Sequence, residues 1–295
     1  MEKLESKRFS IAAHITLILA SVACLVPFIL LFVSSVTDEK TLLRDGYSFF
    51  PAKFSMEAYD YLLNQWQMIT RAYGITIFVT VVGTAVSLLI TSMLAYPLSR
   101  KDLPGRKILA FVVVFTILFS GGLVPTYIMY TTYFHIKNTI WALIVPRWLM
   151  GGFNVLLMRS FFTTSIPPAL IESASIDGAS EFKIFYKIVM PLSPPIVATV
   201  GLMTGLGYWN DWYNGLIYLT NSRLFSLQVV LNDILMNIQN LANSDLGNRV
   251  SGDKILPGTS VRMAIATIGV VPVLAAYPFF QKYFVKGITL GAVKG

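Results

Sequence analysis

Charged residues are scarce in this chain of 295 residues. Lys, Arg, Asp and Glu together make up 13% of it, whereas soluble domains contain about a quarter. Hydrophobic residues make up 55%. A water-soluble fold cannot bury so large an apolar fraction, and the sequence therefore predicts an integral membrane protein.

Residues that bind metals or form disulfides are nearly absent. The only cysteine is Cys24, and the two histidines are His14 and His135. One thiol can form neither a disulfide within the chain nor a thiolate metal site, and neither histidine has carboxylates arranged near it in the sequence. We expect no metal site and no proton relay, and we expect Cys24 to serve in packing.

Motifs for catalysis and nucleotide binding are also missing. The chain has no Gly-x-x-x-x-Gly-Lys-Ser/Thr loop to hold ATP phosphates, no His-Glu-x-x-His and no Gly-x-Ser-x-Gly. We expect no catalytic residue and no cofactor on this chain. The net charge of +8 does not indicate nucleic-acid binding, because the basic residues neither gather on one helical face nor alternate with exposed aromatics.

Long apolar stretches are what the sequence contains instead. About 20 mainly apolar residues cross a bilayer, and six stretches qualify: 11–36, 72–98, 108–130, 139–157, 194–219 and 261–284. We predict an all-α membrane protein with six transmembrane helices. Residues 11–284 form this domain, between a short N-terminal segment, 1–10, and a C-terminal tail, 285–295.

Basic residues predict the orientation, because Lys and Arg in short loops favour the cytoplasm. They precede the first stretch, crowd the connection between the second and third, and follow the last: Lys3, Lys7, Arg8, Arg100, Lys101, Arg106, Lys107, Lys282, Lys286 and Lys294. Both termini are expected in the cytoplasm. The first stretch is too long for a signal-peptide core and lacks a convincing cleavage site, so we expect it to remain as a span. Residues 37–71 and 220–260 are then outside.

The cytoplasmic connection 159–193 is much longer than the other short loops. Pro167 and Pro168 suit the start of a helix, which Asp177-Gly178 ends because Gly tolerates the left-handed conformation of a helix C-terminus. A second helix follows. Ser180 is expected to cap it, with Glu181 in its first turn and Pro191 at its end.

Small residues at this bend would let a partner approach the backbone closely, and Glu172 is the only acid of the first helix. Glu172 suits a basic group on a partner or a nearby backbone amide. From the residues alone, an amphipathic hairpin that merely lies on membrane lipid remains open as an alternative.

The run Glu172-Ser-Ala-Ser-Ile-Asp-Gly-Ala-Ser, with Ile188-Val-Met-Pro191, resembles the EAA loop of binding-protein-dependent ABC importer permeases. That pattern is Glu-Ala-Ala, a Gly four residues after the second Ala, and Ile-x-x-Pro further on. Ser173 stands in place of the first Ala, a change between small residues. The resemblance implies that seven residues couple this chain to an ATPase: Glu172, Ser173, Ala174, Asp177, Gly178, Ala179 and Pro191.

The resemblance extends over nearly the whole chain. Ala95-Tyr-Pro-Leu-Ser-Arg100, residues 138–146 and Tyr208-Trp-Asn-Asp-Trp212 are similar to maltose-type carbohydrate-uptake permeases, and residues 284–295 to the tail of the shorter of the two permeases in that branch. Residues 119–127 resemble the subgroup for complex oligosaccharides, including those that contain uronates.

What the resemblance implies is a type I ABC importer permease fold in the bacterial cytoplasmic (inner) membrane. The importer would contain a second homologous permease, two cytoplasmic ATPase subunits that bind ATP and Mg, and an extracytoplasmic sugar-binding protein. Closure of the ATPases would move the docked helix 172–179 and switch the spans between two packings. The tail 285–295 would reach the ATPase interface, although its composition alone also fits a frayed terminus.

A sugar path needs polar groups within the bilayer, where they are costly without a partner or water. The best candidates lie in the outer half of the fifth stretch: Tyr208, Trp209, Asn210, Trp212 and Asn214. Aromatic rings stack on sugar rings and amides bond to hydroxyls, but Trp and Tyr also form interfacial belts that bind nothing.

Arg147 lies well inside the fourth stretch, beside Pro146, where a kink can open the backbone. An arginine at such a depth is a functional hypothesis by default, here a water-facing group that attracts an anionic sugar. Snorkelling, or pairing with Asp211, is the competing interpretation. For the whole chain, the alternative function is a secondary transporter or channel subunit for a small solute, which the scarcity of acids in the stretches disfavours.

Overall fold

The computed structural model describes residues 2–243 and 258–292. Across these residues the regular structure is helical, apart from one isolated antiparallel bridge between Thr37 and Phe54. The all-α prediction is therefore confirmed for the described part of the chain. Part of the expected outer segment and the end of the predicted tail lie outside the described residues.

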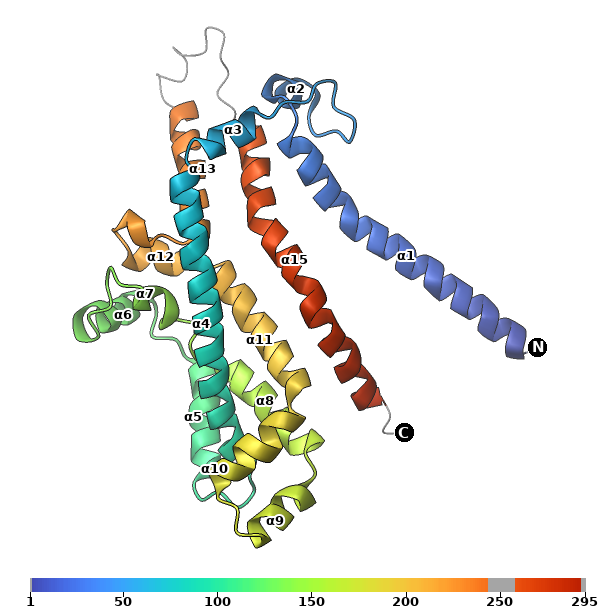
Figure 1. Ribbon diagram of the computed structural model, residues 1–295, viewed down its shortest axis with the longest axis vertical. Helices are drawn as coiled ribbons and strands as arrows, with labels where there is room; N and C mark the ends of the chain where they lie inside the picture. The colour runs from blue at the N-terminus through green and yellow to red at the C-terminus, as the bar shows by residue number, and fades with distance from the viewer. Residues whose placement is uncertain (1, 244–257, 293–295) are drawn as a thin grey trace. The chain divides into compact units, whose positions relative to one another are not determined.

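The chain divides into two compact units, residues 1–69 with 231–272 and residues 70–230 with 273–295. In chain order the helices (Figure 1) are α1 (Glu2–Ser35), α2 (Glu39–Asp45), α3 (Glu57–Leu63), α4 (Trp66–Ser99), α5 (Arg106–Leu118), α6 (Leu123–Ile128), α7 (Trp141–Ile144), α8 (Gly152–Ser165), α9 (Pro168–Ile176), α10 (Glu181–Ile184), α11 (Pro194–Trp209), α12 (Tyr213–Tyr218), α13 (Leu227–Asn243) and α15 (Thr259–Ala292).

In the first unit, two neighbouring acids accept hydrogen bonds at the N-termini of different helices. Asp38 caps α2 by accepting from the backbone N–H of Thr41, and Lys53 Nζ lies 3.0 Å from its other oxygen. The Lys53 contact lowers the pKa of Asp38. Glu39 is buried and accepts from the backbone N–H groups of Thr259 and Ser260, at 2.7 and 2.8 Å. A carboxylate there complements the positive end of α15.

In the second unit, α11 lies against α4. Tyr208 of α11 is buried, and a Cβ on Gly83 of α4 would lie 2.6 Å from its ring. Only glycine leaves room for this close approach. The hydroxyl of Tyr208 also donates to the carbonyl oxygen of Ile144 at 2.8 Å. Tyr208 therefore joins α11, α4 and the end of α7.

Helices long and apolar enough to cross a membrane are fewer than the six expected. Within the described residues, three qualify alone: Phe9–Ser35, Trp66–Ser99 and Thr259–Pro278. Two bent pairs qualify together, Arg106–Leu118 with Leu123–Tyr133 at 114°, and Glu181–Leu192 with Pro194–Trp209 at 82°. The structure thus contains three to five candidate spans, and it does not confirm the count of six.

The expected fourth span, 139–157, is not one helix. Helix α7 ends at Ile144 and α8 begins at Gly152, so residues 145–151 interrupt it. Arg147 has a φ of +70°, in the left-handed region that non-glycine residues rarely occupy. The fifth stretch is interrupted too, between the end of α11 at Trp209 and the start of α12 at Tyr213. Apolar composition alone did not reveal either break.

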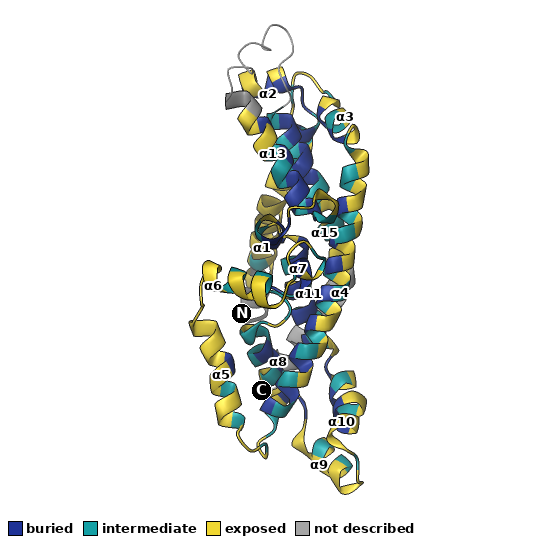
Figure 2. Cartoon of the chain, turned by 90° about the vertical axis from the view of Figure 1, so that its left-hand side faces the viewer, coloured by how far each residue is buried: buried dark blue, intermediate teal, exposed yellow. Residues whose placement is uncertain are grey.

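Helices α5 and α6 expose side chains along most of their length (Figure 2). Three phenylalanines on α5 and its C-cap, Phe111, Phe115 and Phe119, form a row of neighbouring rings 6.2 and 4.4 Å apart. All three are exposed. Apolar surface of this extent fits a chain surrounded by lipid or by another membrane subunit.

Candidate functional site

Helix α9 begins and ends where the sequence predicts. Pro168 occupies its first turn, and Asp177 is its C-cap. Gly178 has a φ of +76°. The N–H of Ala179 donates to the carbonyl of Ala174 at 3.0 Å, and the N–H of Gly178 to that of Ser175 at 3.1 Å. This pair of hydrogen bonds is a Schellman motif, which needs the left-handed residue that Gly178 provides.

The second helix of the loop is also capped as predicted. The Ser180 side chain accepts from the backbone N–H of Lys183, and Glu181 lies in the first turn of α10. A π-helical turn, Phe185–Val189, and a 3-10 turn, Met190–Leu192, continue the chain. The second turn contains Pro191, and the chain then bends by 82° into α11.

The two faces of the loop differ in exposure. Ile171, Ala174 and Ala179 pack against a buried core that α4, α8 and α10 share. The predicted coupling residues on the other face are exposed: Glu172, Ser173, Asp177, Gly178 and Pro191. Ile176 beside them is 86% exposed. The loop thus presents two acids, small residues and the large apolar side chain of Ile176 to the surroundings, and the coupling role of these residues stays a prediction.

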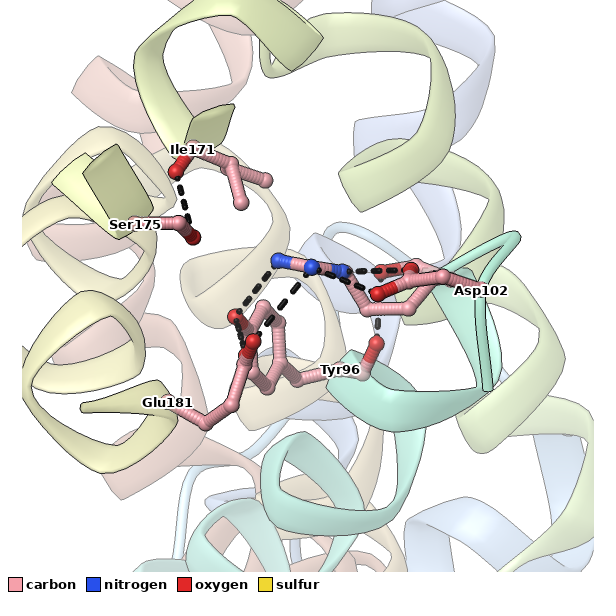
Figure 3. A network of polar contacts seen from close by, with 7 residues as sticks. Tyr96, Asp102, Ile171, Ser175 and Glu181 are labelled. Atoms are coloured by element: carbon pink, nitrogen blue, oxygen red, sulfur yellow. Dashed lines mark hydrogen bonds and ion pairs between the residues drawn. The ribbon is translucent and has the colours of Figure 1, made fainter. Parts of the chain in front are cut away.

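A polar network ties α10 to the end of α4, as Figure 3 shows for Tyr96 and Glu181. The Tyr96 hydroxyl donates to Glu181 Oε2 at 2.6 Å. Arg100 Nη2 lies 3.3 Å from Glu181 Oε1 and also donates to Asp102, whose oxygens lie 3.0 and 2.8 Å from Arg100 Nε and Nη2. The same figure shows the Ser175 hydroxyl bonded to the Ile171 carbonyl on α9.

Arg100 is the centre of this network. Its side chain is 18% exposed, while those of Asp102 and Glu181 are 68% and 61% exposed. The hydrogen bonds from Arg100 lower the pKa of Asp102 to about 2, and the hydrogen bonds to Asp102 raise the pKa of Arg100 above its ordinary value. Arg100 stays cationic and links the connection between α4 and α5 to the predicted coupling loop, residues 159–193.

The sequence did not predict this network. In the sequence, Arg100 is only one of the basic residues that predict the orientation and the last residue of the motif 95–100. Glu181 is only an acid in the first turn of a predicted helix. Tyr96 and Glu181 are 85 residues apart, and nothing in their local sequence indicates a contact over that separation.

The other candidate site lies where the fourth and fifth stretches are interrupted. The last carbonyl of α7 and two carbonyls of the irregular segment accept hydrogen bonds from side chains of other elements. Tyr208 donates to Ile144, Asn214 to Pro146 at 3.1 Å, and Ser87 to Trp148 at 3.2 Å. Irregular backbone at membrane depth is tolerated when it is buried in protein or lines a watery cavity. These bonds give the interrupted segment a fixed shape.

Asp211 fixes the second break. It is buried, and its two carboxylate oxygens accept from the backbone N–H and the side-chain amide of Asn214 at 3.1 and 2.6 Å. The Asp211 carbonyl accepts from the Ser226 hydroxyl at 3.2 Å. The amide of Asn214 therefore joins both breaks, because it donates to Asp211 and to Pro146 at the same time.

The six predicted path residues separate into two groups. Tyr208, Trp209 and Asn214 are buried, whereas Asn210, Trp212 and Arg147 are exposed. The amide of Asn210 donates to the Leu206 carbonyl at 3.0 Å and helps to end α11. The substrate role of all six stays a prediction.

Arg147 lies among aromatic rings. Its guanidinium carbon is 5.1 Å from the centre of the Trp148 ring and 5.9 Å from that of Tyr213, which in turn contacts Trp212 edge to face. Across the described residues, no ion pair joins Arg147 to Asp211. The structure therefore does not contain the salt bridge considered for these two residues, and Arg147 stays an exposed cation.

Residues 103–290 match the family described as binding-protein-dependent transport system inner membrane components. The chain belongs to this family of transport permease subunits. The family predicted from the loop motif is confirmed, and with it the expectation of a transport subunit rather than a catalytic one.

Relatives align along nearly the entire chain. The polygalacturonan/rhamnogalacturonan transport system permease protein YtcP of Bacillus subtilis is 37% identical over 292 residues, 99% of this chain and 100% of the relative. The protein LplC of the same organism is 37% identical over 272 residues, 92% and 90% of the two chains.

A solved structure has the same fold. It is described as the crystal structure of a bacterial ABC transporter involved in the import of the acidic polysaccharide alginate. The TM-score is 0.77 and the identity 27%, over 94% of this chain and 97% of the other. A similarity of this extent identifies the fold as that of an ABC importer permease.

Proposed function

We propose that this chain is the permease subunit of an ATP-driven sugar importer and forms half of the path for an oligosaccharide that contains uronic acids. The names of the relatives support this substrate class, since one carries polygalacturonan or rhamnogalacturonan and the solved neighbour belongs to an alginate importer. Polygalacturonan and alginate are both acidic polysaccharides.

One observation in the structure carries the proposal. Two interrupted segments meet through Asn214, and beside this junction Arg147 is exposed next to the rings of Trp148 and Tyr213. Discontinuous helices are where transporters build their substrate sites. An exposed guanidinium binds a uronate carboxylate through charge-assisted hydrogen bonds, and an aromatic ring can stack on the apolar face of the same sugar. The site thus matches the two halves of a uronic acid.

The proposed assembly contains a second homologous permease, two cytoplasmic ATPase subunits that bind ATP and Mg, and an extracytoplasmic sugar-binding protein. It lies in the inner membrane with both termini of this chain in the cytoplasm. The exposed face of α9 docks on an ATPase. Nucleotide shifts the equilibrium between the two packings of the spans only by the difference between its affinities for them.

Purification of the wild-type chain from its native membrane in a gentle detergent tests the assembly. We expect an ATPase subunit and a second permease to copurify, as identified by mass spectrometry, and uptake in cells to stop when ATP is depleted. A chain that purifies alone, with uptake that persists without ATP and fails with the ion gradient, would overturn the proposal in favour of a secondary transporter or channel.

Arg147→Gln tests the substrate. We expect uptake of a uronate oligosaccharide to fall about tenfold or more, because one charge-assisted interaction contributes roughly 1.5–3 kcal/mol. Uptake of a neutral oligosaccharide of the same length, if it is carried, should change less than twofold. The measurement is uptake of labelled trisaccharides into cells, with the amount of assembled complex determined in parallel.

The matched control is Arg223→Gln, which removes an exposed arginine from a 3-10 turn, Ser222–Leu224, without touching the junction. It should leave uptake unchanged. If Arg147→Gln instead prevents assembly, or lowers neutral and acidic uptake equally, Arg147 has a structural role and the substrate assignment is wrong.

A further inference from the structure

A hollow of about 690 Å³ lies where α5 begins, and Arg159 of α8 also lines it. Three further cations line it, Lys101 from the connection between α4 and α5, and Arg106 and Lys107 from the first turn of α5. Its lining contains no acidic side chain. Four positive charges therefore face one space.

None of these four cations has a carboxylate partner among the residues that the structure describes. The nearest acid in the sequence, Asp102, is held by Arg100 through two hydrogen bonds. Arg106 Nε donates to the carbonyl of Leu98 at 2.9 Å, which holds its guanidinium at the wall of the hollow. Four like charges without a counter-charge repel one another, and an anion in the hollow would relieve that repulsion.

The backbone adds to the positive potential. Helix α5 begins at this hollow with Gly105 as its N-cap, which offers no side chain to the first N–H groups, and no acid lies in its first turn. The positive end of the helix dipole is therefore not neutralised locally.

Apolar surface continues from the hollow along α5. Leu103, Ile108 and Ala110 line it together with the cations. Ile108 is 69% exposed, and Phe111 one turn further along is 66% exposed. A ligand with a phosphate at one end and hydrocarbon at the other would satisfy both parts of this surface, whereas free phosphate would satisfy only the cations.

We propose that this hollow binds the phosphate headgroup of an anionic phospholipid, with Lys107 and Arg159 as the principal contacts and the acyl chains along α5. Basic pockets at the ends of membrane-spanning helices bind such headgroups. The site contains none of the residues of the proposed sugar path, so it does not depend on the proposed substrate.

Native mass spectrometry of the full-length chain in mild detergent tests the site, with dioleoyl phosphatidylglycerol and dioleoyl phosphatidylcholine as probes. We expect phosphatidylglycerol to bind the wild type at least tenfold more tightly. In the Lys107→Gln, Arg159→Gln double variant its affinity should fall about 25-fold, since each juxtamembrane cation contributes about fivefold.

Two further variants separate the site from general charge and from misfolding. Lys183→Gln with Lys187→Gln removes the same charge from exposed positions outside the hollow and should keep the preference. Lys107→Arg with Arg159→Lys keeps the charge and should also keep it. Equal binding of the two lipids, equal loss in the Lys183 and Lys187 variant, or displacement of phosphatidylglycerol by millimolar inorganic phosphate would each overturn the lipid assignment.

Discussion

Gly178→Val is expected to remove the ATPase from the purified complex and to reduce sugar uptake to the background of an empty membrane. Gly178 has a φ of +76° and carries the Schellman motif that ends α9. A β-branched side chain in this conformation is strained by about 1–3 kcal/mol, which α9 relieves by changing its last turn. The exposed residues from Glu172 to Asp177 would then no longer present one surface. Copurification and uptake measure the two losses.

The chain contains a matched control for this strain. Gly46 also has a φ of +76°, and a Cβ at Gly46 or at Gly178 meets no atom within 4 Å. Gly46→Val should therefore cost similar strain at the end of α2 while leaving the ATPase bound. Gly178→Asn, which tolerates the left-handed region, should restore much of the function. Loss of the ATPase with Gly46→Val, or normal uptake with Gly178→Val, would contradict the docking role of the loop.

Arg100→Gln is expected to leave the ATPase bound but to lower uptake about tenfold. The coupling loop would still fold, because its caps are local, yet α10 would lose the ion pair that joins Glu181 to the α4–α5 connection and keep only the hydrogen bond from Tyr96. Since Glu181 is 61% exposed, the lost stability is small, about 1 kcal/mol. The variant is expected to weaken the coupling between ATP hydrolysis and the movement of the spans. The measurement is the amount of sugar taken up per ATP hydrolysed by the assembled complex.

Two other variants locate this effect. Asp102→Asn breaks the contact of Arg100 within its own connection but keeps Glu181 in place, and it should stay near wild type. Arg44→Gln removes an arginine from an exposed pair with Asp45 in the first unit and should have no effect. If Asp102→Asn lowers uptake as much as Arg100→Gln does, uptake depends on the shape of the α4–α5 connection and not on the ion pair between Arg100 and Glu181.

The coupling loop could be predicted closely because each of its signals is local. A proline at a helix start, an Asp-Gly pair at its end and a capping serine act within a few residues, and α9 and α10 follow them. The family followed for the same reason, since its motif falls on this loop. Long apolar windows, by contrast, average over the breaks, and so composition predicts continuous spans through residues 145–151 and 210–212.

The candidate path could be predicted only in part. Composition identified aromatic and amide side chains in the fifth stretch, but it could not separate the buried Tyr208 and Asn214 from the exposed Trp212. That distinction depends on partners in the fourth stretch, such as the carbonyls of Ile144 and Pro146. The proline beside Arg147 did indicate an opening of the backbone, and it was the one sequence signal for this break.

Helix α11 has a discontinuity at each end, the 82° bend before Pro194 and the turn after Trp209. Its 16 residues form a rod about 24 Å long, with the coupling loop at one end and the junction at the other. Neither end continues into another straight helix, but Tyr208 near the junction packs against Gly83 of α4 and donates to the Ile144 carbonyl, so a tilt of the rod would have to carry these contacts with it. A tilt of about 10° around the loop end would displace the junction by about 4 Å, roughly the width of a sugar ring.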